Sequence, residues 1–484
     1  MRRSASAALL CAALASSGHL RAQSPAPTAP IATAIATALD SAPLAGARVA
    51  VMLADATSGQ VLFERDADAP MNPASDTKLI TAAAALATLG PSHRFVTTLR
   101  GDAVGPSVRG ALFLRGDGDP SLTSADLRAM VHDLEMAGVR NVDGDVVVDD
   151  EALGAEHTPP AFDQQPHENA PFRAQVSGAS VDENTLVVHV RPALHPGAPA
   201  VVVVEPEGYA EVSSTVSTSA GAGTSVQVRS SPRSGGGERL EITGSVGVEA
   251  HPGSLRRREE DPSLATAWAL RTALRAAGIS VHGTVRVAPG AARDASVLAS
   301  HASGPLSALL YEVGKSSNNL YAEETLLSVG ARAIGRPPTY AAATAAVLAW
   351  CVGAGVDTRG LVLRNGSGLF DANRVSSRQL VQVLRAAWRD PAMRDEYVAQ
   401  LAVGGDDGTL RQRLQIPGAS RIVRAKTGTL DDVTALSGYV LTAEPGRALA
   451  FSILINGVQG RATEARALAD RAVAAMVAWT RPPN

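Results

Sequence analysis

The spacing of apolar and polar residues predicts a helix, two strands and a second helix at the start of the chain. Residues 31–39 have the apolar spacing of a short helix. Alternating runs at 47–53 and 60–64 flank Thr57-Ser58-Gly59 and predict a hairpin. A strongly helical run extends from Ser75 to Leu89, and Gly90 stops it.

The pattern changes between about residues 94 and 290, where short alternating runs separated by Gly, Pro and Asp dominate. They predict strands at 111–115, 146–149, 186–190, 201–204 and 225–228. Residues 213–237 are rich in Ser, Gly and Thr, which indicates an exposed β-edge or a mobile loop.

Long helical patterns return after residue 305. They predict helices at 320–330, 340–352 and 377–389, a strand pair at 435–442 and 448–456, and a final helix at 462–480. Thr339 is predicted to be the N-cap of the helix at 340–352. The outer segments, 31–93 and 291–484, are therefore predicted to form one α/β domain that is interrupted by a β-rich insertion at 94–290.

The N-terminus has the three parts of a signal peptide. Arg2 and Arg3 precede a short apolar run, and a processing site is expected near Ala22. The apolar run is too short to span a bilayer, so we expect residues 1–22 to direct secretion, with a periplasmic location and no transmembrane anchor. Residues 23–30, rich in Pro and Ala, are expected to form a linker.

Composition narrows the function further. The chain is 45% hydrophobic and 19% charged, with a net charge of −3, so no basic field favours nucleic acid or an anionic membrane.

Of its two cysteines, Cys11 lies in the predicted signal peptide and Cys351 in an apolar helix, so no internal disulfide is expected. The ten histidines show no metal-ligand spacing and no H-E-x-x-H occurs, so neither a metal nor another cofactor is predicted.

Lysine is rare in this chain, with Lys78, Lys315 and Lys426 as its only examples among 44 basic residues. Lys78 follows Ser75 at an i, i+3 spacing, which places both side chains on one face of a helix. A serine hydroxyl needs an adjacent base to act as a nucleophile, and a buried amine with a lowered pKa supplies one. The alternative is a serine N-cap followed by an exposed lysine.

Two further clusters carry polar groups at element boundaries. Lys426-Thr427-Gly428-Thr429 precedes the C-terminal strands, where a lysine and two hydroxyls suit a substrate carboxylate and Gly428 permits close approach of a substrate backbone. Ser317-Asn318-Asn319 follows Lys315 at a helix start, and its outer two side chains can both face a cleft. The alternatives are an ordinary strand entry and a plain N-cap cluster. A phosphate-binding loop is excluded because Leu309 stands where the first glycine belongs.

Taken together, Ser-x-x-Lys, Ser-x-Asn and Lys-Thr-Gly occur in the order found in the active-site serine penicillin-recognising enzymes. In the long stretch between its first two motifs, the chain resembles the D-alanyl-D-alanine carboxypeptidases and endopeptidases of the class C low-molecular-mass penicillin-binding proteins, which carry a large insertion at that point. Asn318 stands where many relatives have Asp. The resemblance implies a three-layer helix–sheet–helix transpeptidase-like domain, with the insertion forming two nested small domains.

The resemblance also implies a role for each motif residue. Ser75 would attack the penultimate D-alanine carbonyl of a peptidoglycan stem peptide, Lys78 would act as base, and Ser317 would relay the proton. Asn319 would orient the peptide amide, and Lys426, Thr427 and Thr429 would hold the terminal carboxylate beside Gly428. β-Lactam antibiotics would acylate Ser75. Two alternatives remain open: a β-lactamase or esterase of the same fold, and a wall-peptide sensor without turnover.

Overall fold

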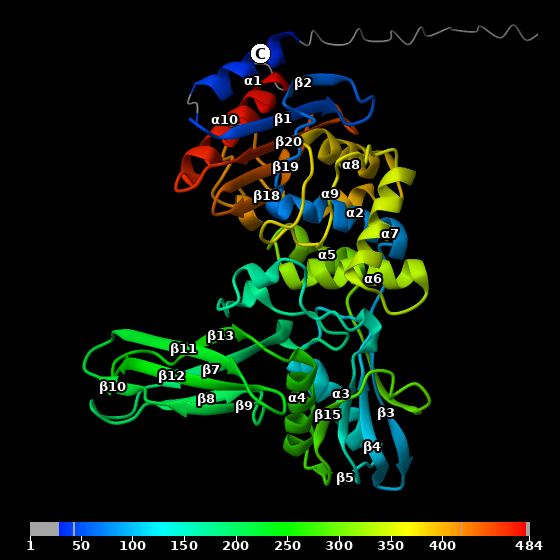
Figure 1. The fold of residues 1–484 in the computed structure, drawn as a ribbon, viewed down its shortest axis with the longest axis vertical. Helices are drawn as coiled ribbons and strands as arrows, with labels where there is room; N and C mark the ends of the chain where they lie inside the picture. Colours follow the sequence, from blue (N-terminus) through cyan, green and yellow to red (C-terminus); the bar gives the residue numbers. More distant parts are fainter. Residues whose placement is uncertain (1–28, 42–43, 418, 481–484) are drawn as a thin grey trace, which may run out of the picture.

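The computed structural model describes residues 29–41, 44–417 and 419–480 (Figure 1). The predicted signal peptide and all but the last two residues of the predicted linker lie outside these ranges.

The upper part of Figure 1 contains a six-stranded antiparallel sheet. Its order is β17 (Ala402–Val403), β18 (Val423–Leu430), β19 (Val433–Leu441), β20 (Ala448–Asn456), β1 (Arg48–Asp55) and β2 (Val61–Arg65). The predicted hairpins are confirmed as β1–β2 and β19–β20. Because β1 pairs with β20 from Arg48–Asn456 to Asp55–Leu449, the two ends of the chain share one sheet.

Helices cover both faces of this sheet. Side chains of β1 therefore point alternately into two separate hydrophobic cores. Ala50 and Met52 belong to one hydrophobic core, with α2 (Thr77–Leu89), α5 (Leu306–Gly314), α6 (Asn319–Ile334), α7 (Tyr340–Gly353) and α8 (Ser377–Arg389). Val51 and Leu53 belong to a second core, with α1 (Ala29–Asp40) and α10 (Ala462–Thr480). The predicted three-layer α/β fold is therefore confirmed.

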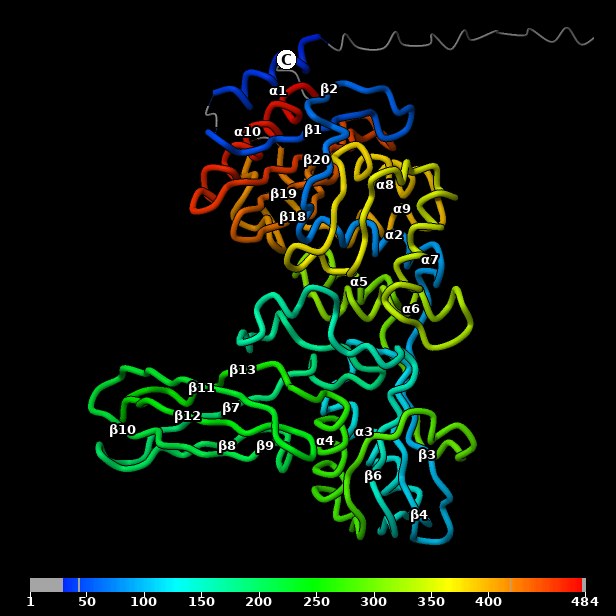
Figure 2. The backbone as a smooth tube through the Cα atoms, in the orientation of Figure 1, coloured from blue at the N-terminus to red at the C-terminus, as the bar shows by residue number. Residues whose placement is uncertain are grey.

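The chain leaves this domain between α2 and β3 and returns between β16 and α5 (Figure 2). The inserted region contains an α/β unit built on a seven-stranded sheet. Its elements are β3 (Val96–Val104), β4 (Ser107–Arg115), β5 (Asn141–Val142), β6 (Val146–Asp149), β14 (Ser280–Val281), β15 (Val285–Val287), β16 (Val297–Ala302), α3 (Ser124–Met136) and α4 (Pro262–Ala276).

Between β6 and α4 the chain forms a second unit, in which two small sheets share one core. One sheet is β13 (Gly253–Arg258), β7 (Thr185–Arg191) and β8 (Val201–Glu205). The other contains β9 (Ala210–Ser214), β10 (Ser217–Ser219), β11 (Thr224–Pro232) and β12 (Glu238–Gly247). We call this second unit, residues 185–258, the β-sandwich.

Three local expectations need correction or refinement. The insertion does not end at residue 290, because β16 pairs with β3 and extends its sheet to Ala302. Of the two alternatives for residues 213–237, the exposed β-edge is confirmed and the loop is wrong, since the segment contains β10 and the edge strand β11. The helix predicted from Ser75 begins as a 3₁₀ turn at Ala74–Asp76, and its α-helical part starts at Thr77.

Two expectations about the helices are confirmed. Thr339 is the N-cap of α7 and accepts a hydrogen bond from the backbone N–H of Ala342, and Cys351 is buried in the same helix. Among the described helices, none combines the length and the apolar character needed to cross a membrane.

Candidate active site

Ser75 lies in the 3₁₀ turn that leads into α2. The turn is held from both sides, because the Asn72 side-chain oxygen accepts from the Ala74 N–H at 2.9 Å and the Thr77 hydroxyl donates to the Ala74 carbonyl at 2.9 Å. Ala74 has a positive φ of 45°, which turns the chain sharply just before the serine. The turn leaves the Ser75 side chain partly exposed at the wall of a cleft.

Lys78 lies directly behind Ser75 and is 1% exposed. Its Nζ is 2.9 Å from Ser75 Oγ, 2.7 Å from Asn319 Oδ1 and 2.8 Å from the Ser367 carbonyl oxygen. As an ammonium, Lys78 donates to all three oxygens. As a neutral amine, it keeps two donated bonds and offers a lone pair to the Ser75 proton.

The surroundings of Lys78 favour the neutral amine. Burial lowers its pKa well below 10.5, and the positive charge of Lys426 lowers the pKa further. Glu323 and Asp76 act in the opposite direction. Both carboxyl groups are completely buried, and burial raises the pKa of each, which weakens them as counter-charges.

Ser317 and Lys426 form the second half of the site. Lys426, on β18, is 1% exposed, and its Nζ donates to Ser317 Oγ at 2.8 Å and to the Thr427 carbonyl at 2.7 Å. Burial lowers the pKa of Lys426, while nearby Asp76 raises it. Ser317 has a positive φ of 61°, so the residue before α6 is held in a left-handed conformation that aims its hydroxyl at β18.

Asn318 and Asn319 connect the site to the inserted region. Asn319 Nδ2 donates to the Phe172 carbonyl at 2.8 Å, while its Oδ1 binds Lys78. Asn318 caps α6, and its Nδ2 donates to the Glu183 carboxylate at 3.0 Å. Phe172 and Glu183 both belong to the insertion, which therefore contacts two of the three residues in the Ser-x-Asn motif.

The turn at Gly366-Ser367-Gly368 also belongs to the site, although it lies outside the three sequence motifs. Glu323 accepts hydrogen bonds from the backbone N–H groups of Gly366 and Ser367, at 2.9 and 2.8 Å, and so aims the Ser367 carbonyl at Lys78. Gly368 is required here, because a Cβ would lie 1.8 Å from the Ala74 carbonyl oxygen. Glu323 had a sequence signal: it is a charged residue in an apolar helical run, four positions after Asn319.

Asp76 is a second buried group that the motif analysis missed. Its Oδ2 accepts from the Ser437 hydroxyl at 2.6 Å, which ties the start of α2 to β19. Burial raises the pKa of Asp76, whereas the Ser437 hydrogen bond and the two lysines of the site lower it.

The three residues that follow Lys426 on β18, Thr427, Gly428 and Thr429, each have different contacts. The Thr427 hydroxyl bonds to Thr409 at 2.8 Å, and the exposed Thr429 hydroxyl accepts from Arg466 at 3.4 Å. A Cβ on Gly428 would lie 2.8 Å from the Pro73 carbonyl oxygen. The glycine thus lets β18 pack against the turn that carries Ser75. The sequence analysis expected Gly428 to permit close approach of a substrate backbone, so the structure gives this glycine a different role.

Lys315, the third lysine, has a structural role. Its Nζ forms an ion pair with Asp407 at 2.6 Å and donates to the Leu401 carbonyl. The predicted site residues thus form two hydrogen-bonded groups, Ser75–Lys78–Asn319 and Ser317–Lys426, and Lys315 belongs to neither group.

A cleft of about 1130 Å³ opens in front of these two groups. Ser75, Ser317, Asn319 and Thr429 face it from the catalytic domain, and Phe172 faces it from the insertion. The outer edge of β18 has no strand partner beyond Ala425 among the described residues, so an extended chain in the cleft would find free backbone groups there. A hydroxyl, a buried amine and an open strand edge are the components of acyl transfer from a peptide to a serine.

Comparisons with known proteins agree with this chemistry. The chain is 37% identical over 443 residues to a D-alanyl-D-alanine carboxypeptidase of Actinomadura sp. (strain R39), a match that covers 88% of this chain and 80% of the relative. The fold of this chain is similar to the crystal structure of penicillin binding protein 4 (dacB) from Haemophilus influenzae. In that match the TM-score is 0.76 and the identity 24%, over 90% of this chain and 97% of the other.

The same Haemophilus protein in complex with a β-lactam matches with a TM-score of 0.70 and 25% identity, over 87% of this chain and 93% of the other. The family model for D-Ala-D-Ala carboxypeptidase 3 (S13) matches residues 31–481. This chain is therefore a serine-type peptidase and belongs to the D-Ala-D-Ala carboxypeptidase 3 (S13) family.

Proposed function

We propose that this protein is secreted by means of residues 1–22 and cleaves D-Ala-D-Ala peptides of peptidoglycan in the periplasm. It acts as a carboxypeptidase, as an endopeptidase at D-Ala–diaminopimelate cross-links, or as both. The observation that carries the proposal is the contact of 2.9 Å between Ser75 Oγ and the buried, pKa-lowered amine of Lys78.

In the acylation step, Ser75 Oγ forms an ester with the penultimate D-alanine, and the amide bond to the leaving residue breaks. Lys78 takes the serine proton, and Ser317 returns a proton to the leaving amine. Lys426, Thr427 and Thr429 hold the terminal carboxylate. The backbone N–H groups of Ser75 and Thr429 stabilise the oxyanion. Water then hydrolyses the ester and regenerates the serine. No cofactor takes part in this sequence.

A β-lactam contains a strained amide that the same serine can attack, so penicillin is expected to form a stable ester with Ser75. The β-lactam complex of the Haemophilus relative supports this expectation. Hydrolysis of that ester distinguishes the candidates. Slow release combined with peptide turnover supports a carboxypeptidase or endopeptidase, whereas fast release would indicate a β-lactamase.

The decisive experiment is labelling with a fluorescent penicillin, followed by mass spectrometry of the labelled peptide. We expect Ser75→Ala to abolish the label while the variant stays folded. Ser316→Ala serves as the matched control, because Ser316 is exposed and lies beside the motif. Turnover of diacetyl-Lys-D-Ala-D-Ala by the unmodified protein completes the test. Labelling without turnover would favour the sensor, and labelling at another serine would overturn the assignment.

A further inference from the structure

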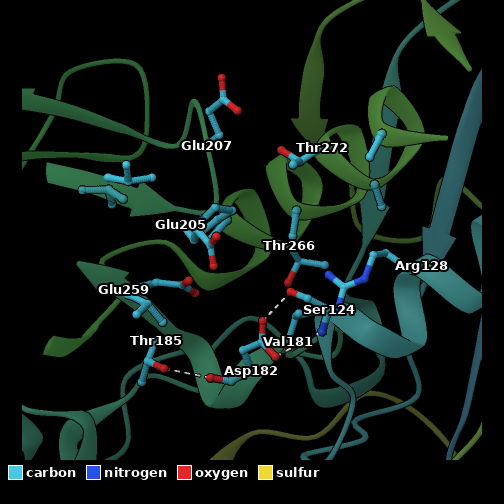
Figure 3. Close-up of a pocket in the computed structure, with 18 residues that line it drawn as sticks. Ser124, Arg128, Val181, Asp182, Thr185, Glu205, Glu207, Glu259, Thr266 and Thr272 are labelled. Carbon is cyan, nitrogen blue, oxygen red and sulfur yellow. Dashed lines mark hydrogen bonds between the residues drawn. The ribbon is translucent and has the colours of Figure 1, made fainter. Parts of the chain in front are cut away.

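A second cavity, of about 260 Å³, lies in the insertion where the β-sandwich meets α4 (Figure 3). Apolar side chains form much of its wall, including Val203 and Val204 of β8 and Ala265, Ala269 and Ala273 of α4. It shares no lining residue with the active-site cleft.

Glu259 gives this cavity a definite chemistry. The residue is 3% exposed, and its side chain points into the cavity (Figure 3). No hydrogen bond or ion pair from the described residues reaches its carboxyl group. Asp182, on the same wall, is in contrast bound by the backbone N–H and the hydroxyl of Ser124. A buried carboxyl without a partner costs free energy, which a ligand with a suitable donor would recover.

The remaining charges around the cavity favour a cation. Glu205 lies at the cavity and is exposed, and Glu207 is paired with Arg275. Arg128 on α3 is the only basic residue among the described lining residues. Within the described part of the chain, no three Asp, Glu, His or Cys side chains are grouped as metal ligands. The apolar walls instead suit a cation that carries a hydrocarbon stem.

We propose that this cavity binds a small organic cation, with a primary ammonium group on Glu259 and a short apolar stem against the alanines of α4 and the valines of β8. The ammonium supplies the three donors that the buried carboxylate lacks, and the stem removes apolar surface from water. This site is separate from the proposed peptidase reaction.

Binding at this site should release a proton. Burial raises the pKa of Glu259 well above 4.5, and the charges of Glu238, Asp182 and Asp261 raise it further, against the opposing charge of Arg256. Glu205, whose carboxylate lies 3.5 Å from His189 Nε2, and Arg128 are the other ionisable groups beside Asp182 and Glu207 that line the cavity. An ammonium favours the ionised carboxylate, so we expect the affinity to increase with pH until Glu259 is ionised in the free protein.

The test uses the full chain and n-pentylammonium chloride, with binding followed by isothermal titration calorimetry. Saturable binding is expected, and 1-pentanol and pentanoate, which keep the stem and change the head group, should bind at least tenfold more weakly. Prior acylation of the active site with penicillin should leave binding unchanged. A failure of the proposed peptidase function would therefore not affect this result.

Two variants and one control locate the binding. Glu259→Gln removes the charge and Ala269→Leu fills the cavity, and each should weaken binding at least tenfold. Glu211→Gln, an exposed position of the same β-sandwich outside the cavity, should have no effect. Absence of saturable binding, equal affinity for 1-pentanol, or unchanged affinity in both folded cavity variants would overturn the proposal.

Discussion

Lys78 and Lys426 bring two buried amines into one site, and each contacts a different serine hydroxyl. Lys78 contacts Ser75, and Lys426 contacts Ser317. Both amines are buried, and each charge disfavours the other, so holding both as ammonium ions is costly. The site therefore favours a neutral Lys78 beside the nucleophile and a charged Lys426 towards the substrate side.

The first prediction concerns the pH dependence of acylation. The reaction needs neutral Lys78, so its rate should increase with pH as the lysine loses its proton. Because burial and Lys426 lower the Lys78 pKa well below 10.5, the increase should be complete well below that pH. Stopped-flow measurement of penicillin acylation across pH gives the profile.

The companion variant is Lys78→Arg, which keeps a permanent charge and should be nearly inactive at every pH. If Lys78→Arg acylates at a near-normal rate, Lys78 is not the base, and the proton must leave Ser75 by another route.

Lys426→Arg tests whether a compact ammonium is needed on β18. The Lys426 side chain is almost fully buried and bonds to both Ser317 and the Thr427 carbonyl, so the larger planar guanidinium cannot occupy the same space. We expect kcat/KM on D-Ala-D-Ala peptides to fall at least tenfold, or about 1.4 kcal/mol in transition-state stabilisation. Wild-type efficiency in this variant would assign Lys426 no role in recognition.

At the scale of elements, the start of α6 is held in place by the insertion as well as by its own domain. The turn Asp182-Glu183-Asn184 has three successive positive φ values, 50°, 59° and 52°, and carries Glu183 to Asn318. Such a conformation is strained for residues other than glycine, so the surrounding contacts must stabilise it. Asn184 donates to the Ser180 hydroxyl, which in turn donates to the buried Glu324 of α6.

We therefore expect Glu183 to position the Ser-x-Asn motif. Glu183→Ala removes the acceptor of Asn318 and should slow penicillin acylation about threefold to tenfold, by loosening Ser317 and Asn319. Glu183→Gln keeps an acceptor oxygen and should recover most of the rate. Equal rates in wild type and Glu183→Ala, with the melting temperature unchanged, would show that this contact does not position the motif.

At the scale of the whole molecule, the insertion has two parts with different relations to the cleft. Residues before the β-sandwich, such as Phe172 and Glu183, contact the motif directly. No residue of the β-sandwich is among those that line the cleft. The β-sandwich is therefore expected to influence access of large substrates and not the acylation chemistry.

A loop replacement tests this division. Pro232 pairs with Glu238 across β11 and β12, so residues 233–237 can be replaced by Asn-Gly, a turn that suits a two-residue hairpin. We expect penicillin acylation to change less than about twofold, because no residue of the loop lines the cleft. A loss beyond tenfold in a folded variant would show that the β-sandwich belongs to the acylation machinery.

The sequence alone determined the elements and the motif chemistry of this protein. The helical spacing of Ser75 and Lys78, the two hairpins of the central sheet and the N-cap at Thr339 depend on residues close together in the chain, where local periodicity is informative. The rare lysines marked two of the site residues because desolvation can neutralise lysine but not arginine.

Only the tertiary structure decided which groups complete the site. The Ser367 and Phe172 carbonyls bind Lys78 and Asn319, yet every residue carries a carbonyl, and no pattern distinguishes those two. The same holds for Glu183, whose partner Asn318 lies 135 positions further along the chain. Such contacts depend on the path that the chain takes between elements. That path is fixed only on folding, because buried backbone and polar groups must then find hydrogen-bond partners.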